Sequence, residues 1–194
     1  MKRTSIHIVA ALAAALTLAA CGGDEDTAGT DTGSSSDPVS MDEHTVADVT
    51  FAQGMIPHHA QAVEMSDLVL AKDDIGDGVT ALAEQIKAAQ QPEIDQMTGW
   101  MEAWGEDMPE MGGMDHPMNG MMSQQEVDAI GEASGPESAR LYLEAMKAHH
   151  EGAIAMAETE VAEGSNPEAI ALAETIITTQ RAEITEIEDL LAAM

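Results

Sequence analysis

The chain contains an internal repeat, and this repeat restricts its fold more than any other feature. Residues 51–65 read FAQGMIPHHAQAVEM and residues 142–156 read YLEAMKAHHEGAIAM, so an aromatic residue, two methionines, a His-His pair and an alanine recur at a constant offset of 91. Residues 81–94 (ALAEQIKAAQQPEI) match residues 171–184 (ALAETIITTQRAEI) at an offset of 90, with eight of fourteen positions identical. Each half therefore predicts a motif helix followed by a partner helix, and the two halves predict a duplicated helical hairpin.

Helical periodicity and Gly- or Pro-containing breaks define the expected elements. The predicted helices span approximately residues 45–72, 79–104, 124–133, 137–163 and 167–192. Ser123 and Glu126 are expected to open the short helix as a capping box. Pro57 and Pro92 fall inside predicted helices, where each removes a backbone donor and is expected to bend the axis. Four long helices with short loops inside each half predict an all-α four-helix bundle over residues 41–194.

The first forty residues have the composition of a targeting segment and a linker. Lys2 and Arg3 precede an apolar run over residues 6–20, which ends in Leu-Ala-Ala before Cys21. This arrangement resembles a bacterial lipoprotein signal, so we expect residues 1–20 to be removed and Cys21 to be lipidated. The alternative is an ordinary secreted protein in which Cys21 is incidental. Residues 21–40 are polar and acidic, and they predict a flexible tether.

Composition excludes several classes of function. The 194 residues include 36 Asp plus Glu against 7 Lys plus Arg, a formal charge of −29. Such a chain lacks the basic surface that nucleic-acid binding requires, and it is repelled by anionic lipid. We therefore expect an extracytoplasmic protein that meets the membrane only through its lipid. The single Cys excludes a disulfide framework and a Cys-cluster zinc site.

One stripe of each motif helix combines apolar residues with histidine and methionine. At heptad spacing the first stripe holds Phe51, Met55, His58, Ala62, Met65 and Val69, and the second holds Tyr142, Met146, His149, Ala153 and Met156. His59 and His150 flank these stripes. The pattern predicts that imidazoles and thioethers from both halves point into the bundle. Histidines satisfied by carboxylates within an ordinary core are the alternative, but four unpaired interior imidazoles would be costly to desolvate.

The donor types indicate a soft or borderline metal. Imidazole suits copper, zinc and iron, whereas thioether selects Cu(I) over hard ions. Glu93 and Glu183 occupy equivalent places on the partner helices, where they could orient the histidines, ligate directly or simply face solvent. The motif helices lack the Glu-x-x-His pairs of a di-iron carboxylate bundle, which argues against that type of site.

A loop over residues 105–122 concentrates further sulfur ligands. It contains Met108, Met111, Met114, His116, Met118, Met121 and Met122 among glycines and prolines. Outside the cytoplasm thiols are oxidised to disulfides, whereas thioethers are neutral and are not lost in this way. We therefore expect this loop to capture Cu(I). A plain connector between the halves is the alternative, although it would needlessly expose oxidisable side chains.

These motifs resemble the two signature helices of a family called domain of unknown function 305. The resemblance covers residues of about 44–192 and rests on the doubled Met-x-x-His-His pattern followed by Ala and Met. It implies a ferritin-like four-helix domain outside the cytoplasm, associated in some members with copper binding and resistance. The family residues correspond here to Met55, His58, His59, Met65, Met146, His149, His150 and Met156. Lys147-Ala148 replaces Ile56-Pro57 in the second motif, so the two halves need not bind equally.

Four functions remain open at this point. We favour a non-enzymatic lipoprotein that binds Cu(I), and also Cu(II), for buffering, resistance or delivery. The others are a metal oxidoreductase acting on Cu(I) or Fe(II), a non-covalent haem bundle, and a structural surface module. Passive binding needs no catalytic base, and the fold alone does not supply an activity. Homo-oligomerisation and a protein that receives the ion are left undecided by the sequence.

Overall fold

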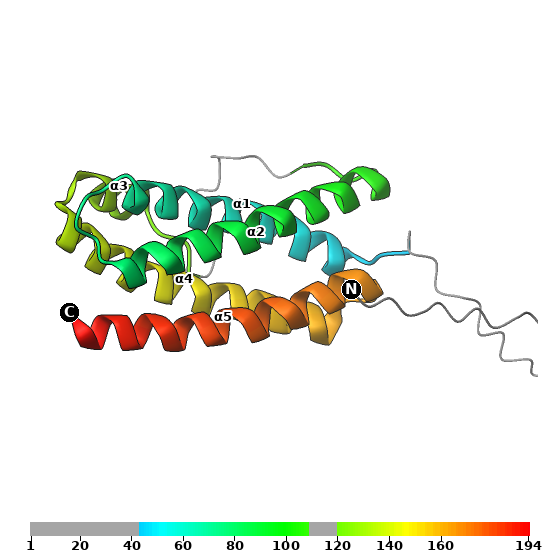
Figure 1. Cartoon of the computed structure of the whole chain (residues 1–194). Helices are drawn as coiled ribbons and strands as arrows, with labels where there is room; N and C mark the ends of the chain where they lie inside the picture. The colour runs from blue at the N-terminus through cyan, green and yellow to red at the C-terminus, as the bar shows by residue number, and fades with distance from the viewer. Residues whose placement is uncertain (1–42, 109–119) are drawn as a thin grey trace, which may run out of the picture. The chain divides into compact units, whose positions relative to one another are not determined.

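The computed structural model describes residues 43–108 and 120–194, and within these ranges α-helices joined by loops are the regular secondary structure (Figure 1). The helices are α1 (Val46–Leu70), α2 (Asp77–Trp104), α3 (Gln124–Glu132), α4 (Gly135–Glu163) and α5 (Pro167–Ala193). The predicted all-α bundle is confirmed, with each helix end within two residues of its expected place. The proposed signal peptide, tether, Cys21, Met111, Met114, His116 and Met118 lie outside the described residues. No helix in the described ranges is both long and apolar enough to cross a membrane.

Local side-chain chemistry sets the helix ends. The backbone N–H of Thr45 donates to Asp48 at 2.6 Å as α1 begins, and that of Ser123 donates to Glu126 at 2.8 Å as α3 begins, which confirms the predicted capping box. The side chain of Asn166 accepts from two backbone N–H groups at the start of α5. At the end of α2, Gly105 takes a left-handed conformation with φ of 72°.

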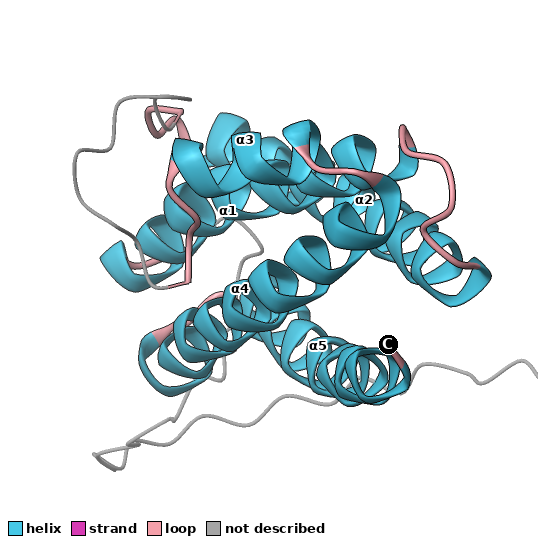
Figure 2. Cartoon of the chain, turned by 90° about the vertical axis from the view of Figure 1, so that its left-hand side faces the viewer, coloured by secondary structure: helices cyan, strands magenta, loops and turns pink. Residues whose placement is uncertain are grey.

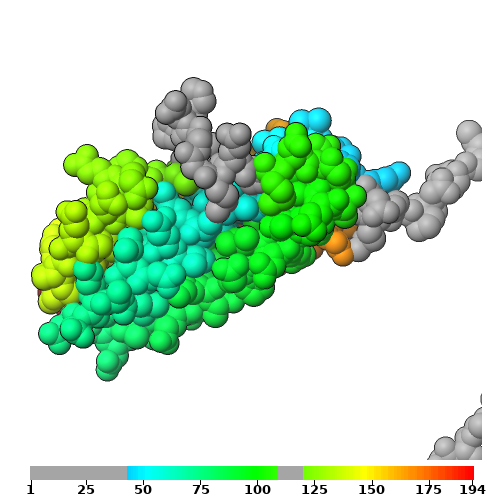
Figure 3. Space-filling view, turned by 90° about the horizontal axis from the view of Figure 1, so that it is seen from above, coloured from blue at the N-terminus to red at the C-terminus, as the bar shows by residue number. Residues whose placement is uncertain are grey.

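Two helical hairpins form the bundle, one from α1 and α2 and one from α4 and α5 (Figure 2). The hairpins meet chiefly through α1 and α4, and α3 packs on both of these helices. Seen from above, the start of α1 and the end of α2 share one end of the bundle, with α3 at the other (Figure 3). At the first end the ring of His44 stacks on Trp104 with centroids 4.6 Å apart. The two motif helices are therefore the central pair, and their facing sides meet in the interior.

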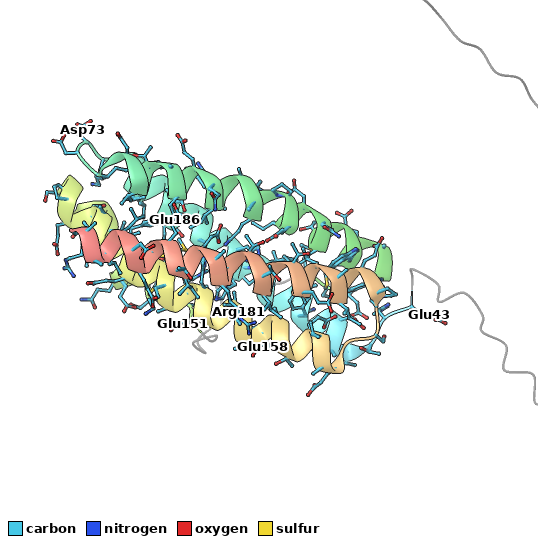
Figure 4. All side chains as sticks on the ribbon, turned by 60° about the horizontal axis from the view of Figure 1, so that its bottom comes forward. Glu43, Asp73, Glu151, Glu158, Arg181 and Glu186 are labelled. Carbon is cyan, nitrogen blue, oxygen red and sulfur yellow. The ribbon has the colours of Figure 1, made fainter. Side chains whose placement is uncertain are left out.

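The outer faces of α4 and α5 carry many acidic side chains (Figure 4). Arg181 of α5 reaches Glu158 of α4 at 2.6 Å, an exposed ion pair that links the two helices. Because exposed ion pairs add little free energy, the helices are held mainly by their buried residues.

Two apolar clusters fill the core and leave a polar layer between them. The first cluster, near α3, includes Ala62, Met65, Tyr142 and Met146, and the second, at the opposite end, includes Phe51, Met55, Met97 and Ala153. Along α1 and α4 the His-His pairs fall between members of the two clusters. The buried residues of this polar layer are His58, His59, Gln90, His149, His150, Gln180 and Glu183. The hydrophobic core is thus interrupted at the level of the repeated motif.

Candidate metal centre

The four motif histidines lie together inside the bundle. His58 and His59 of α1 and His149 and His150 of α4 are each 0% exposed. The rings of His58 and His149 contact each other, with centroids 3.7 Å apart and planes inclined by 39°. The structure therefore brings the two repeats together across the α1–α4 interface, although 91 positions separate them in the sequence.

His59 and His150 are the outer histidines of the layer. Each of them pairs with a carboxylate from the partner helix of its own hairpin. Glu93 of α2 accepts a hydrogen bond from Nε2 of His59 at 2.7 Å, and Glu183 of α5 accepts one from Nε2 of His150 at 2.9 Å. The two pairs repeat the same geometry in both halves of the chain. They differ in exposure, because the Glu93 side chain is 15% exposed and that of Glu183 is 3% exposed. Gln85 also donates to Glu183 at 3.2 Å, which ties the two hairpins together.

These carboxylates leave the second ring nitrogen of each histidine available. A carboxylate acceptor places the proton on Nε2, so Nδ1 keeps its lone pair. The Nδ1 atoms of His59 and His150 are buried and make no hydrogen bond. Metal-ligating histidines characteristically bind the ion through one nitrogen and donate the other N–H to a carboxylate. The arrangement therefore has the form of an oriented pair of metal ligands.

Burial also keeps His149 in the form that binds metals. Desolvation lowers the pKa of His149 well below its ordinary value, and the neighbouring His58, His150 and His59 lower it further, while a backbone contact from His58 acts in the opposite direction. A neutral imidazole offers a lone pair, whereas an imidazolium does not.

The methionines of the motifs divide into two groups. Met55 and Met146 are fully buried and precede His58 and His149 by three residues, an axial distance of about 4.5 Å. Met65 and Met156 follow the same histidines by seven residues, about 10 Å along the helix. Met65 lies inside the first apolar cluster, and Met156 lines a pocket of about 610 Å³ between α1 and α4. The first group thus lies within about one turn of the histidines along each helix, and the second lies about two turns away.

The donor set fits a soft ion better than a hard one. Among the described residues, no group of three or more His, Cys, Asp or Glu side chains is already arranged around a common point. A ready cage of nitrogen and oxygen ligands is therefore absent from this part of the chain. What the layer offers is buried imidazole with thioether one turn away, which is the combination that copper accepts and calcium or magnesium does not.

Side chains of α1 hold both described ends of the Met-rich loop. Gln53 donates to the carbonyl of Asp107 at 2.9 Å, and Gln61 donates to the carbonyl of Met122 at 2.9 Å and accepts from its N–H. Gly120 lies against the backbone of α4, where a Cβ would come within 3.0 Å of the carbonyl oxygen of His149. Met108 is 45% exposed. The loop thus leaves and rejoins the domain along the α1–α4 side, where the histidines also lie.

Two groups of buried polar residues were given no role from the sequence. Gln90 and Gln180 are buried in the polar layer, and their equivalence at an offset of 90 was the signal that could have identified them. Asp48 and Glu160 form a second buried polar group near the start of α1. Their pairing depends on how α1 meets α4, which sequence spacing does not reveal.

The comparison with known families settles the family of this chain. The model of the domain of unknown function DUF305 matches residues 48–191. The chain belongs to the DUF305 family. No curated protein matches it.

Solved structures of DUF305 proteins have the same fold. A DUF305 fragment from Deinococcus radiodurans is 32% identical with a TM-score of 0.70, and the match covers 77% of this chain and 98% of the fragment. A DUF305 protein from Streptomyces coelicolor, provisionally named a secreted protein, is 33% identical with a TM-score of 0.70, over 76% of this chain and 93% of that one. CopM in its Cu(II)-bound form is 29% identical with a TM-score of 0.66, over 75% of this chain and 96% of CopM. CopM has also been solved with Cu(I) and with Ag.

Proposed function

We propose that this DUF305 protein is an extracytoplasmic lipoprotein that binds copper in its histidine layer and serves copper buffering, resistance or delivery. The observation that carries the proposal is the repeated carboxylate–imidazole pair, His59 with Glu93 and His150 with Glu183, each with a buried and unbonded Nδ1. An unpaired buried nitrogen costs free energy that a bound ion would recover. Binding of Cu(I), Cu(II) and Ag by CopM supports copper as the ion.

The ligand roles follow from the placement of each donor. His58, His59, His149 and His150 supply nitrogen, and Met55 and Met146 supply thioether sulfur from one turn away. Glu93 and Glu183 orient the outer histidines and hold the ring proton on Nε2. The sulfur-rich loop over residues 105–122 captures Cu(I) and passes it toward the α1–α4 side. Copper here is cargo, and the protein needs no catalytic base to hold it.

Membrane attachment is a separate part of the proposal. The signal-like segment before Cys21 supports lipidation, and the charge of −29 disfavours any other contact with an anionic bilayer. Mass spectrometry of Cys21 in protein from the native membrane fraction tests this part. An unmodified Cys21 at an intact or differently processed N-terminus would contradict it.

An anaerobic titration against a chromogenic Cu(I) chelator tests the metal site. The double variant His59→Ala with His150→Ala is expected to lose most of the tight binding, because both oriented ligands are removed. His44→Ala is the matched control, since His44 lies outside the polar layer with its side chain 21% exposed. Far-UV circular dichroism checks that each variant keeps its helices. Unchanged Cu(I) affinity in a folded double variant would show that the histidine layer is not the site.

A further inference from the structure

Two buried glutamines in the polar layer have no role in the site described above. Gln90 of α2 and Gln180 of α5 are each 2% exposed. Neither the oxygen nor the nitrogen of the Gln90 amide makes a hydrogen bond, and the oxygen of the Gln180 amide makes none. The two glutamines occupy equivalent positions in the repeat, at an offset of 90. An isolated unsatisfied amide could be an accident of packing, but the same feature in both halves calls for a common cause.

Both amides lie at the level of the histidines. Gln90 precedes Glu93 by one turn of α2, and Gln180 precedes Glu183 by one turn of α5. On the buried stripe of α2, Gln90 falls between Ile86 of the first cluster and Met97 of the second. On α5, Gln180 falls between residues 176 and 187, which belong to the second and first clusters respectively. The glutamines therefore occupy the same gap in the apolar core as the His-His pairs.

An apolar residue of similar size would suit an empty core better. A buried amide that gains no partner on folding loses its hydrogen bonds to water without replacement. Leucine at these positions would connect the two apolar clusters without burying an unpaired polar group. A cation that binds in the layer and is ligated by the amide oxygens would remove this free-energy cost.

We propose that Gln90 and Gln180 supply neutral oxygen donors to the ion in the histidine layer, and that they raise the affinity of the layer for Cu(II) without raising it for Cu(I) or Ag(I). This inference rests on the proposed copper site and names the residues that set its preference between oxidation states. An amide carbonyl is a hard donor that assists Cu(II), which takes nitrogen and oxygen ligands. Cu(I) and Ag(I) take sulfur and gain little from it. The histidines and Met55 or Met146 then serve the softer ions, while the glutamines matter chiefly for Cu(II).

The test compares Cu(II) and Ag(I) affinities of the full mature chain by ligand competition. The double variant Gln90→Leu with Gln180→Leu removes both amides and leaves the histidines, methionines and carboxylates in place. Cu(II) affinity is expected to fall by about tenfold or more, the range seen when supporting residues of metal sites are removed. Ag(I) affinity is expected to stay the same. The electron paramagnetic resonance spectrum of the Cu(II) form should also change, because an oxygen donor has left the ion.

Two further variants separate a role toward the metal from a structural role. Gln91→Leu is the matched control, since Gln91 is exposed on the same helix and its amide donates to Asp95 one turn away. The double variant Gln90→Glu with Gln180→Glu keeps oxygen at both places and is expected to retain Cu(II) binding. An equal fall for Cu(II) and Ag(I) in the leucine variant, or no change for either ion, would overturn the inference. If the parent chain binds neither ion in its histidine layer, the proposed function fails together with this inference.

Discussion

The imidazole rings of His58 and His149 lie with their centroids 3.7 Å apart across the interface of α1 and α4. Each ring comes from one copy of the same repeated motif, and each is fully buried. Two neutral imidazoles can share this space, whereas two imidazolium ions would repel each other in a medium of low dielectric constant. The contact therefore joins the two halves of the chain at a place where a cation could bind between neutral nitrogens.

Removing the supporting carboxylates should weaken metal binding without removing a nitrogen ligand. The double variant Glu93→Gln with Glu183→Gln is expected to lower copper affinity by about 10- to 100-fold, because the outer histidines lose the charge that orients them. Competition titration measures the effect. Glu186→Gln on the exposed side of α5 is the control and should bind copper like the parent chain (Figure 4). Parent-like affinity in the double variant would show that the two carboxylates only stabilise the fold.

The two groups of methionines should differ in their effect on Cu(I). Met55→Leu with Met146→Leu is expected to reduce Cu(I) affinity by about tenfold, equal to about 1.4 kcal/mol of binding free energy. Met65→Leu should have no such effect, because Met65 lies about 10 Å along α1 from His58. Exchange of Met for Leu in a core costs less than about 1.5 kcal/mol of stability for each substitution, so both variants should fold. Equal losses for the two sets would contradict this division.

The fold could be predicted from the sequence because both halves of the repeat show the same helical periodicity. Each half repeats the spacing of Met55, His58 and Ala62, and that periodicity is sufficient to identify two helices and their inward faces. Contacts between helices could not be predicted from this periodicity. The contact of the His58 ring with the His149 ring follows from how the hairpins cross, and the exposure of Met156 depends on the pocket between α1 and α4. Gln90 and Gln180 were similarly hard to select, since a glutamine on an acidic helix usually faces solvent.

Stability should depend on pH through the buried Asp48–Glu160 pair. Burial, the hydrogen bond that protonated Glu160 donates to Asp48 and the negative charge of Asp48 raise the pKa of Glu160 from 4.5 to about 8. Hydrogen bonds from Thr45 and from the backbone of Asn166 overcome desolvation and lower the pKa of Asp48. Glu160 therefore keeps its proton in the folded chain and donates it to the Asp48 carboxylate.

The sign of the Glu160 effect follows from its raised pKa. Its contribution to stability is fully present below pH 4.5 and is lost as pH rises toward about 8, because only the unfolded chain releases the proton in that window. Metal-free protein should lose at least about 1 kcal/mol of unfolding free energy between these limits through this group. Urea denaturation at several pH values measures it. Glu160→Gln should flatten the decline, and an equally steep decline in that variant would assign it to other groups.

Gly120 should be required for the close approach of its segment to α4. Its φ of 81° suits glycine, and a Cβ would come within 2.8 Å of the Ala148 carbonyl oxygen and the Gly152 Cα. Gly120→Ala is expected to cost about 1–3 kcal/mol of stability, as overpacked substitutions do. Gly99→Ala is the opposite control. Gly99 lies within α2 with nothing near its Cβ position, so alanine should stabilise the protein by about 0.5–1 kcal/mol. Equal effects of the two substitutions would show that the Gly120 contact is absent in solution.

Anomalous diffraction at the copper edge from a copper-loaded crystal tests the central claim most directly. We predict a copper peak between α1 and α4, within bonding distance of imidazole nitrogens from both repeated His-His pairs. A peak confined to surface carboxylates or to residues 105–122, with the four histidines unchanged and no density between them, would contradict the account.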